Sequence, residues 1–164
     1  MNFELDKDIR EIKNSVRDFI KDVVDPYANQ IEEKDEIPEQ IMELSKEMGL
    51  FGLSIPEKYG GLGINMLGKC AVYEELGKTH NGYTTVIGAH SGIGTVGIVE
   101  MGNDEQKRKY LPDMATGDRI GAFALTEPDA GSQAYNLKSR AIRKGDKYII
   151  NGSKHFITNA PIAD

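Results

Sequence analysis

Two segments of this sequence carry small hydrogen-bond donors in a spacing that suits a planar or anionic ligand. The first segment is ALTEPDAGS at 124–132, and the second is NGSKHFITN at 151–159. Each runs from apolar residues into backbone rich in glycine and hydroxyl side chains, among them Thr126, Ser132 and Thr158. Because amides and hydroxyls from two loops can converge on one ligand, we expect these segments to form a binding site.

Part of the first segment could have a purely structural role, and a second motif must be considered beside it. Residues 127–131, EPDAG, have the composition of an ordinary turn, which would need no ligand. Residues 92–97, GIGTVG, match the GxGxxG pattern of dinucleotide-binding proteins. That motif requires a strand before it and a long helix after it, whereas Gly102 interrupts the pattern shortly afterwards, so we reject a nicotinamide site there.

Four glycines fall within one expected helix, which runs from about Tyr83 to Met101. Each glycine inside a helix costs about 1 kcal/mol relative to alanine, so their presence needs a reason. Two explanations remain: close packing against a neighbouring helix, or a helix thinned to leave room for a long, slender ligand. The glycines concerned are Gly88, Gly92, Gly94 and Gly97.

Metal and acid–base motifs are missing from the sequence. The histidines at 80, 90 and 155 lack metal-ligand spacing, and Cys70 has no second cysteine with which to form a disulfide. Glu74 and Glu75 are adjacent on an expected helix, where neighbours do not face each other. We therefore expect no metal site and no carboxylate dyad.

The composition of the 164 residues fits a soluble globular protein of one domain or slightly more. The net charge is −6 and no basic face stands out, which argues against a nucleic-acid partner. The longest weakly polar run, 86–99, is too short to span a bilayer. The acidic stretch 1–8 lacks signal- and transit-peptide features, and a single cysteine fits a reducing compartment, so we expect a cytoplasmic location.

The first two-thirds of the chain predict helices. Apolar residues recur at steps of three and four from Leu5 to Val23, which indicates an amphipathic helix that Pro26 kinks or ends. A second helix opens at 37–39 and stops at Gly49, and 56–63 form a loop. Three further helices are expected at 66–78, 83–101 and 104–115, the last capped by Asn103 and ended by Gly117.

Short strands are expected after Gly117. The apolar run 120–125, the alternating run 137–143 and residues 148–150 read as strands, and a further one covers 154–158. Residues 144–147 and the pair at 151–152 read as turns between them. Such strands leave edges and one face uncovered, so we expect the N-terminal piece of a longer protein. The predicted fold is an all-α N-terminal domain, 1–119, followed by the first strands of a truncated β domain, 120–164.

These features together resemble the acyl-CoA dehydrogenase family of flavoproteins. The resemblance covers essentially the whole chain and is strongest at 56–63, 102–112, 125–132 and 151–159. It implies FAD as the cofactor and a helical C-terminal domain beyond this chain. It also implies that the positions of Leu125 and Thr126 hydrogen-bond the pyrimidine edge of the flavin, and that Thr158 serves the N5 and O4 edge.

The resemblance assigns three more residues to the site. Phe123 contributes to the flavin site, Phe156 packs an aromatic ring against the flavin, and Ser132 contacts the acyl-CoA thioester. Gln133 departs from the family, which usually has aspartate after the serine, and so removes a charge from this loop.

The implied activity is FAD-dependent α,β-dehydrogenation of fatty acyl-CoA in β-oxidation. An electron-transferring flavoprotein is the expected acceptor, and the complete protein is expected to be a dimer or tetramer. In the family a glutamate of the C-terminal domain removes the α-proton, so we expect no catalytic residue in this chain and no activity from it alone. The motifs AHSGIG and PIAD, at 89–94 and 161–164, are most similar to the long- and very-long-chain branch. The alternatives are an acyl-CoA oxidase of the same fold and a non-catalytic helical module that binds acyl-CoA or a partner.

Overall fold

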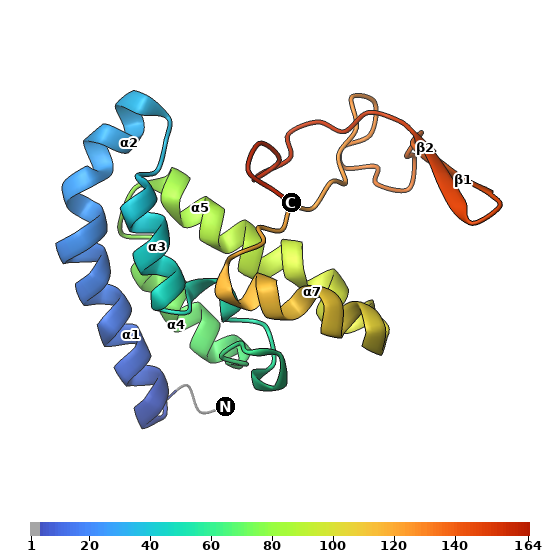
Figure 1. Cartoon of the computed structure of the whole chain (residues 1–164). Helices are drawn as coiled ribbons and strands as arrows, with labels where there is room; N and C mark the ends of the chain where they lie inside the picture. The colour runs from blue at the N-terminus through green and yellow to red at the C-terminus, as the bar shows by residue number, and fades with distance from the viewer. Residues whose placement is uncertain (1–3) are drawn as a thin grey trace.

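The computed structural model describes residues 4–164 as a body of helices followed by a largely extended segment with one small sheet (Figure 1). This order confirms the predicted fold class. The helical elements are α1 (Lys7–Phe19), η1 (Ile20–Val24), η2 (Asp25–Tyr27), α2 (Ala28–Lys34), α3 (Glu39–Glu47), η3 (Leu50–Gly52), η4 (Glu57–Tyr59), α4 (Met66–Leu76), α5 (Asn81–Ala89), η5 (His90–Gly94), α6 (Thr95–Met101) and α7 (Asp104–Thr116). The strands β1 (Arg140–Lys144) and β2 (Lys147–Asn151) pair antiparallel.

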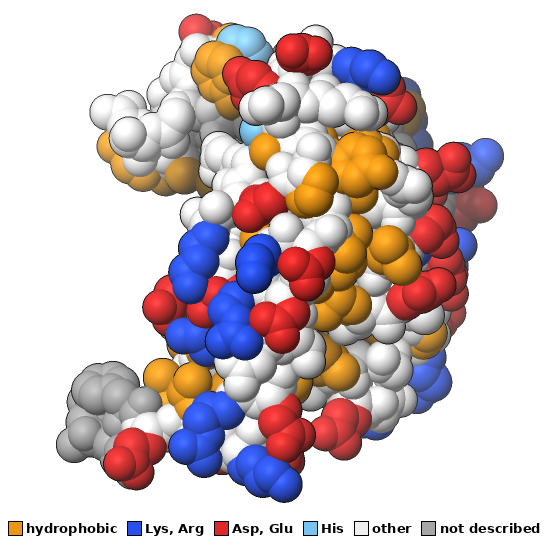
Figure 2. All heavy atoms as spheres, turned by 90° about the vertical axis from the view of Figure 1, so that its left-hand side faces the viewer, with side chains coloured by type: hydrophobic (Ala, Val, Ile, Leu, Met, Phe, Trp, Pro, Cys, Tyr) orange, Lys and Arg blue, Asp and Glu red, His pale blue; other side chains and the backbone are white. Residues whose placement is uncertain are grey.

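The apolar stripe of the first helix forms one wall of the core. Val16 and Ile20 are buried against α3, α4 and α5, as the periodicity predicts. At the end of the stripe Val24 is buried and the predicted Val23 is only half-buried. The opposite face carries charges of both signs with hydrophobic side chains exposed between them (Figure 2). Pro26 does not end the helical path: it lies inside the 3₁₀ turn η2, and the chain stays helical to Lys34. No helix within residues 4–164 is long and apolar enough to cross a membrane.

Helix ends follow the local signals in the sequence. Asn103 and Gln106 form reciprocal side-chain-to-backbone bonds at the start of α7. Gly49 and Gly117 have φ of 71° and 82°, which is the left-handed conformation that ends a helix and that glycine adopts without strain.

The expected continuous helix from 83 to 101 is interrupted. Gly92 has φ −94° and ψ −107°, so the backbone leaves the helical conformation between α5 and α6. Gly94 is explained by close packing, because a Cβ there would lie 2.9 Å from the carbonyl oxygen of Gly121. The neighbour is the segment after α7 rather than another helix. Gly92 and Gly97 face open space within the described part of the chain.

The β region has fewer strands than the sequence predicts. Residues 144–147 form the expected two-residue turn, with Gly145 at φ 64° in its first position. The runs 120–125 and 154–158 form no strands: within residues 4–164 no backbone hydrogen bond joins them, and the nearest one, from His155 to Thr126, falls just beyond the first run. The prediction of a turn at 151–152 is also wrong, because β2 continues to Asn151. Glycine is required at 152 for another reason: a side chain there would collide with Ser139.

Candidate functional site

The two donor-rich segments lie beside each other. The His155 amide donates to the carbonyl oxygen of Thr126 at 2.9 Å, and Lys154 Nζ donates to the carbonyl oxygen of Leu125 at 3.0 Å. Residues separated by almost thirty positions therefore meet where the sequence places a joint binding site.

Several donors at this junction have no acceptor within residues 4–164. They are the backbone amides of Leu125, Thr126 and Thr158 and the hydroxyls of the two threonines. Thr126 is half-buried and Thr158 is exposed, so both are reachable. Unpaired donors that are already held in place on adjacent segments are what a ligand with acceptor atoms along one edge requires.

Large apolar side chains on the same two segments are exposed. Phe156 is 84% exposed, Phe123 48% and Leu125 36%. Phe156 has φ 55°, which is unusual for a bulky residue, and its ring stacks on His155 with centroids 3.9 Å apart. Exposed apolar side chains clustered around polar donors are typical of a ligand-binding surface.

A buried carboxylate organises the turn that follows Thr126. Glu127 accepts hydrogen bonds from Lys154 Nζ at 2.9 Å and from the amides of Lys138 and Ser139 at 2.6 and 3.0 Å. The bond from Lys154, followed by those from Ser139 and Lys138, lowers the pKa of Glu127 to about 2. Paired backbone bonds between Glu127 and Ala130 close the turn.

The sequence correctly indicates a turn at 127–131 but does not reveal the role of its glutamate. Glu127 has no motif of its own, because its three donors come from residues 11 to 27 positions away. The lone lysine in the second segment, Lys154, is the one available hint. Its Nζ donates to the carbonyl oxygen of Leu125 and to the carboxylate of Glu127, and so joins the second segment to the first.

Ser132 lies apart from this junction in the described structure. It is exposed on the loop after the turn and makes no hydrogen bond within residues 4–164. The neighbouring Gln133 accepts a backbone bond from Asn136 at 2.9 Å. Lys138 and Asp129 form an exposed ion pair at 2.6 Å, so the loop keeps a salt bridge without aspartate at 133.

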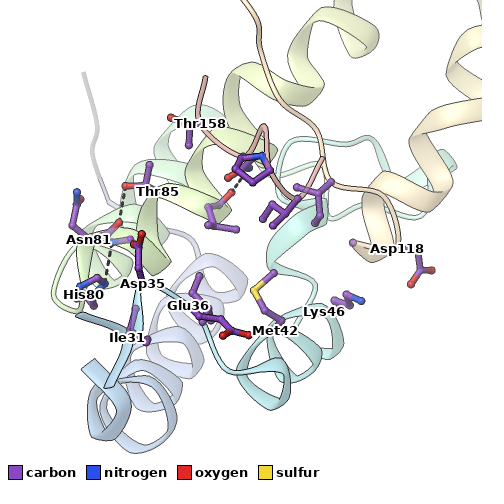
Figure 3. Close-up of a pocket in the computed structure, with 18 residues that line it drawn as sticks. Ile31, Asp35, Glu36, Met42, Lys46, His80, Asn81, Thr85, Asp118 and Thr158 are labelled. Carbon is purple, nitrogen blue, oxygen red and sulfur yellow. Dashed lines mark hydrogen bonds between the residues drawn. The ribbon is translucent and has the colours of Figure 1, made fainter. Parts of the chain in front are cut away.

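A cavity of about 780 Å³ opens beside Thr158 (Figure 3). Thr85 and Asn81 of α5 line one side, and Met42 and Lys46 of α3 line another. Its lining is mainly apolar and includes Ile31, Ile37, Val86, Ile120 and Ile162. None of the four glycines singled out in the sequence lines it. Within residues 4–164, no three His, Cys, Asp or Glu side chains come together in a way that could hold a metal ion.

Comparison with known proteins identifies the family. The acyl-CoA dehydrogenase N-terminal domain profile matches residues 6–118, and the middle domain profile matches 122–164. An acyl-CoA dehydrogenase of Bacillus subtilis is 41% identical over 153 residues, covering 93% of this chain and 40% of that protein. A short-chain-specific acyl-CoA dehydrogenase of Clostridium acetobutylicum is 37% identical, covering 100% of this chain and 43% of that protein.

Solved structures agree with this assignment. A chain from a study of the electron transferring flavoprotein of Acidaminococcus fermentans superposes with a TM-score of 0.93 at 37% identity, covering 100% of this chain and 43% of that chain. An acyl-CoA dehydrogenase from Bacillus anthracis complexed with FAD superposes with a TM-score of 0.89 at 36% identity, covering 98% of this chain and 28% of that chain. The chain belongs to the acyl-CoA dehydrogenase family. It spans less than half the length of these relatives.

Proposed function

We propose that the protein is an FAD-dependent acyl-CoA dehydrogenase. The observation that carries this proposal is the junction of the two segments, where the amides and hydroxyls of Thr126 and Thr158 remain unpaired beside exposed aromatic rings. The donor set fits a flavin, whose ring has acceptor atoms along one edge and two apolar faces. When bound, FAD would supply the hydride acceptor for α,β-dehydrogenation of an acyl-CoA.

The proposed role of each site residue is the one that the resemblance to the family implies, and the chemistry of the residue agrees with it. Donors from Leu125 and Thr126 bind the pyrimidine edge, where reduced flavin gathers negative charge, and Thr158 binds the N5 and O4 edge. Phe123 and Phe156 pack against the ring system. Ser132, on the outer loop, contacts the acyl-CoA thioester.

The wider assignment has two sources. The family suggests a fatty acyl-CoA substrate in β-oxidation and a complete protein that is a dimer or tetramer, and the single cysteine and acidic N-terminal stretch suggest a cytoplasmic location. An electron-transferring flavoprotein accepts the electrons, and the likeness to a chain from a study of such a protein supports this choice. The domain boundary falls between 119 and 120, where the chain leaves the helical body after α7.

Loss of the two threonine hydroxyls should weaken the flavin site. In the complete protein, Thr126→Val and Thr158→Val each remove a donor from an acceptor that would otherwise be paired, at a cost of about 1–3 kcal/mol. We expect lower flavin content after gel filtration or slower flavin reduction by acyl-CoA. Thr116→Val is the control, because the Thr116 hydroxyl bonds to Asp113 and Asp118 at the far end of α7. Unchanged flavin content and reduction in both site variants would refute the assignment.

The same preparation distinguishes the alternatives. Rapid reoxidation of the substrate-reduced protein by air would indicate an acyl-CoA oxidase. Purified complete protein that holds no flavin and takes none up would indicate a non-catalytic module. A dehydrogenase keeps its flavin and is reoxidised slowly by air.

The cavity beside Thr158 is the proposed place for the acyl chain. A carbon that gives a hydride to N5 must lie near Thr158, and the cavity opens there toward Thr85 and Val86. The relatives include a short-chain-specific enzyme, so similarity alone does not select a chain length. The volume of the cavity, about 780 Å³, is the reason to keep the long-chain branch as the proposal.

Chain-length preference tests this placement. Because each buried methylene contributes about 0.8 kcal/mol, kcat/KM should rise with acyl length beyond about eight carbons until the cavity is full. Thr85→Leu should move the optimum to shorter chains. Gly97→Leu serves as the comparison, because Gly97 faces open space and does not line the cavity. An optimum that moves with Gly97→Leu and not with Thr85→Leu would instead support the thinned-helix explanation of the glycines.

A further inference from the structure

The backbone of one residue, Gly121, links the helical body to both proposed flavin-binding segments. The Gly121 amide donates to His90 Nδ1 at 2.8 Å, and the Gly121 carbonyl oxygen accepts from Asn159 Nδ2 at 3.3 Å. The backbone of Gly94 packs directly on it, because a Cβ on Gly121 would lie 3.1 Å from the Gly94 carbonyl oxygen. Gly121 is thus held on three sides.

The chemistry of His90 determines which way its bond to Gly121 runs. Because Nδ1 accepts from an amide, the ring proton lies on Nε2, which is 2.9 Å from the carbonyl oxygen of Met114 and donates to it. The ring is fully buried and stands edge-on to Phe51, with centroids 5.2 Å apart. Burial lowers the pKa of His90, which agrees with a neutral ring.

Asn159 makes the corresponding connection from the second segment. It is buried, has φ 67°, and donates from Nδ2 both to Gly121 and to the carbonyl oxygen of Val86 in α5, the latter at 3.1 Å. Thr158 is its immediate neighbour in sequence. Gly121 lies two residues before Phe123, so the bonds of His90 and Asn159 both act close to the proposed flavin contacts.

We propose that His90 and Asn159 are positioning residues, which hold the two flavin-binding segments at a fixed spacing through the backbone of Gly121. This inference rests on the proposed function. The bonds of His155 and Lys154 join the two segments to each other, whereas the Gly121 connection ties both of them to α5 and η5 of the helical body.

A matched pair of variants of the complete protein separates this role from simple packing. His90→Asn places an amide oxygen near the Nδ1 position and can still accept from Gly121, but it no longer reaches Met114. His90→Gln places its amide near the Nε2 position, so it keeps the bond to Met114 and loses the one to Gly121. A third variant, Asn159→Gly, tolerates the positive φ and removes the side-chain donor.

Two readouts are needed, one of them independent of flavin. In flavin-free protein, hydrogen exchange at the Gly121 amide should speed up about tenfold or more in His90→Gln and stay near wild type in His90→Asn. In flavin-loaded protein, His90→Gln and Asn159→Gly should shift the visible spectrum and the reduction potential of the bound flavin, and His90→Asn should shift neither.

Equal exchange rates in His90→Gln and His90→Asn would overturn the proposal. So would faster exchange in His90→Gln if the flavin spectrum and potential stay unaltered in both His90→Gln and Asn159→Gly. Wild-type protein that binds no FAD would refute the proposed function instead, and the exchange difference would still report whether His90 holds Gly121.

Discussion

Glu127→Gln in the complete protein should retain FAD less tightly by on the order of tenfold to a hundredfold, the loss expected when a buried charged acceptor is removed from its donors. Glutamine keeps the size of the side chain but has one acceptor oxygen in place of two. Lys154 Nζ and the amides of Lys138 and Ser139 all donate to Glu127 in the native structure. At least one of these donors is then left buried and unpaired beside Thr126.

Asp129→Asn is the control for this variant. It removes one carboxylate from the same turn, but the ion pair of Asp129 with Lys138 is exposed, and exposed pairs contribute little. Flavin retention that falls equally in both variants would mean that only the net charge of the turn matters. Retention that falls in neither would mean that Glu127 does not organise the site.

The dependence of folding stability on pH below 4.5 offers a second test of Glu127. Its pKa is about 2 in the folded chain and near its ordinary value of 4.5 when unfolded, so the folded state binds fewer protons between these values. The stabilisation is complete above pH 4.5 and is lost as the pH falls toward 2. Thermal unfolding midpoints should therefore decline less steeply over this range in Glu127→Gln than in wild type. Parallel declines would contradict the lowered pKa.

Gly61→Ala should destabilise the helical body by about 1–3 kcal/mol or more. A Cβ at Gly61 would lie 2.6 Å from the Cβ of Ile55 and would collide with the Ile55 carbonyl. Ile55 is fully buried and cannot move aside. The amides of Leu62 and Gly63 on the same loop bond to the carbonyl oxygens of Gly52 and Ile55, at 2.9 Å each, so the loop is held close to its neighbour.

Gly88→Ala is the matched control for Gly61→Ala. Gly88 lies within α5, and the nearest atom to an added Cβ is a ring carbon of Tyr73 at 4.0 Å. Alanine there should be neutral or stabilising by up to about 1 kcal/mol, because it lowers the conformational cost of the helix. Denaturant unfolding of both variants measures the difference. Similar stability in the two would show that the loop relaxes around a methyl group.

Local signals in the sequence predicted most of the helix positions and the two segments of the proposed site. Asn103 and Gly117 define the ends of α7 through bonds and dihedral angles that involve only nearby residues. The apolar stripe of α1 follows from the helical period alone. The pairing of two donor-rich segments was also visible, because hydroxyls and glycines are read directly from residue types.

Tertiary structure decided what these signals do together. The apolar runs at 120–125 and 154–158 have strand composition, yet a strand requires pairing partners. Within residues 4–164 the one backbone bond near them runs from His155 to Thr126, just beyond the first run. The buried charge of Glu127 depends on donors far away in the chain. The sequence left open whether Gly94 packs on a helix or makes room for a ligand, and in the structure it packs closely on Gly121. Such contacts join residues with no periodic relation in sequence, so only the folded chain brings them together.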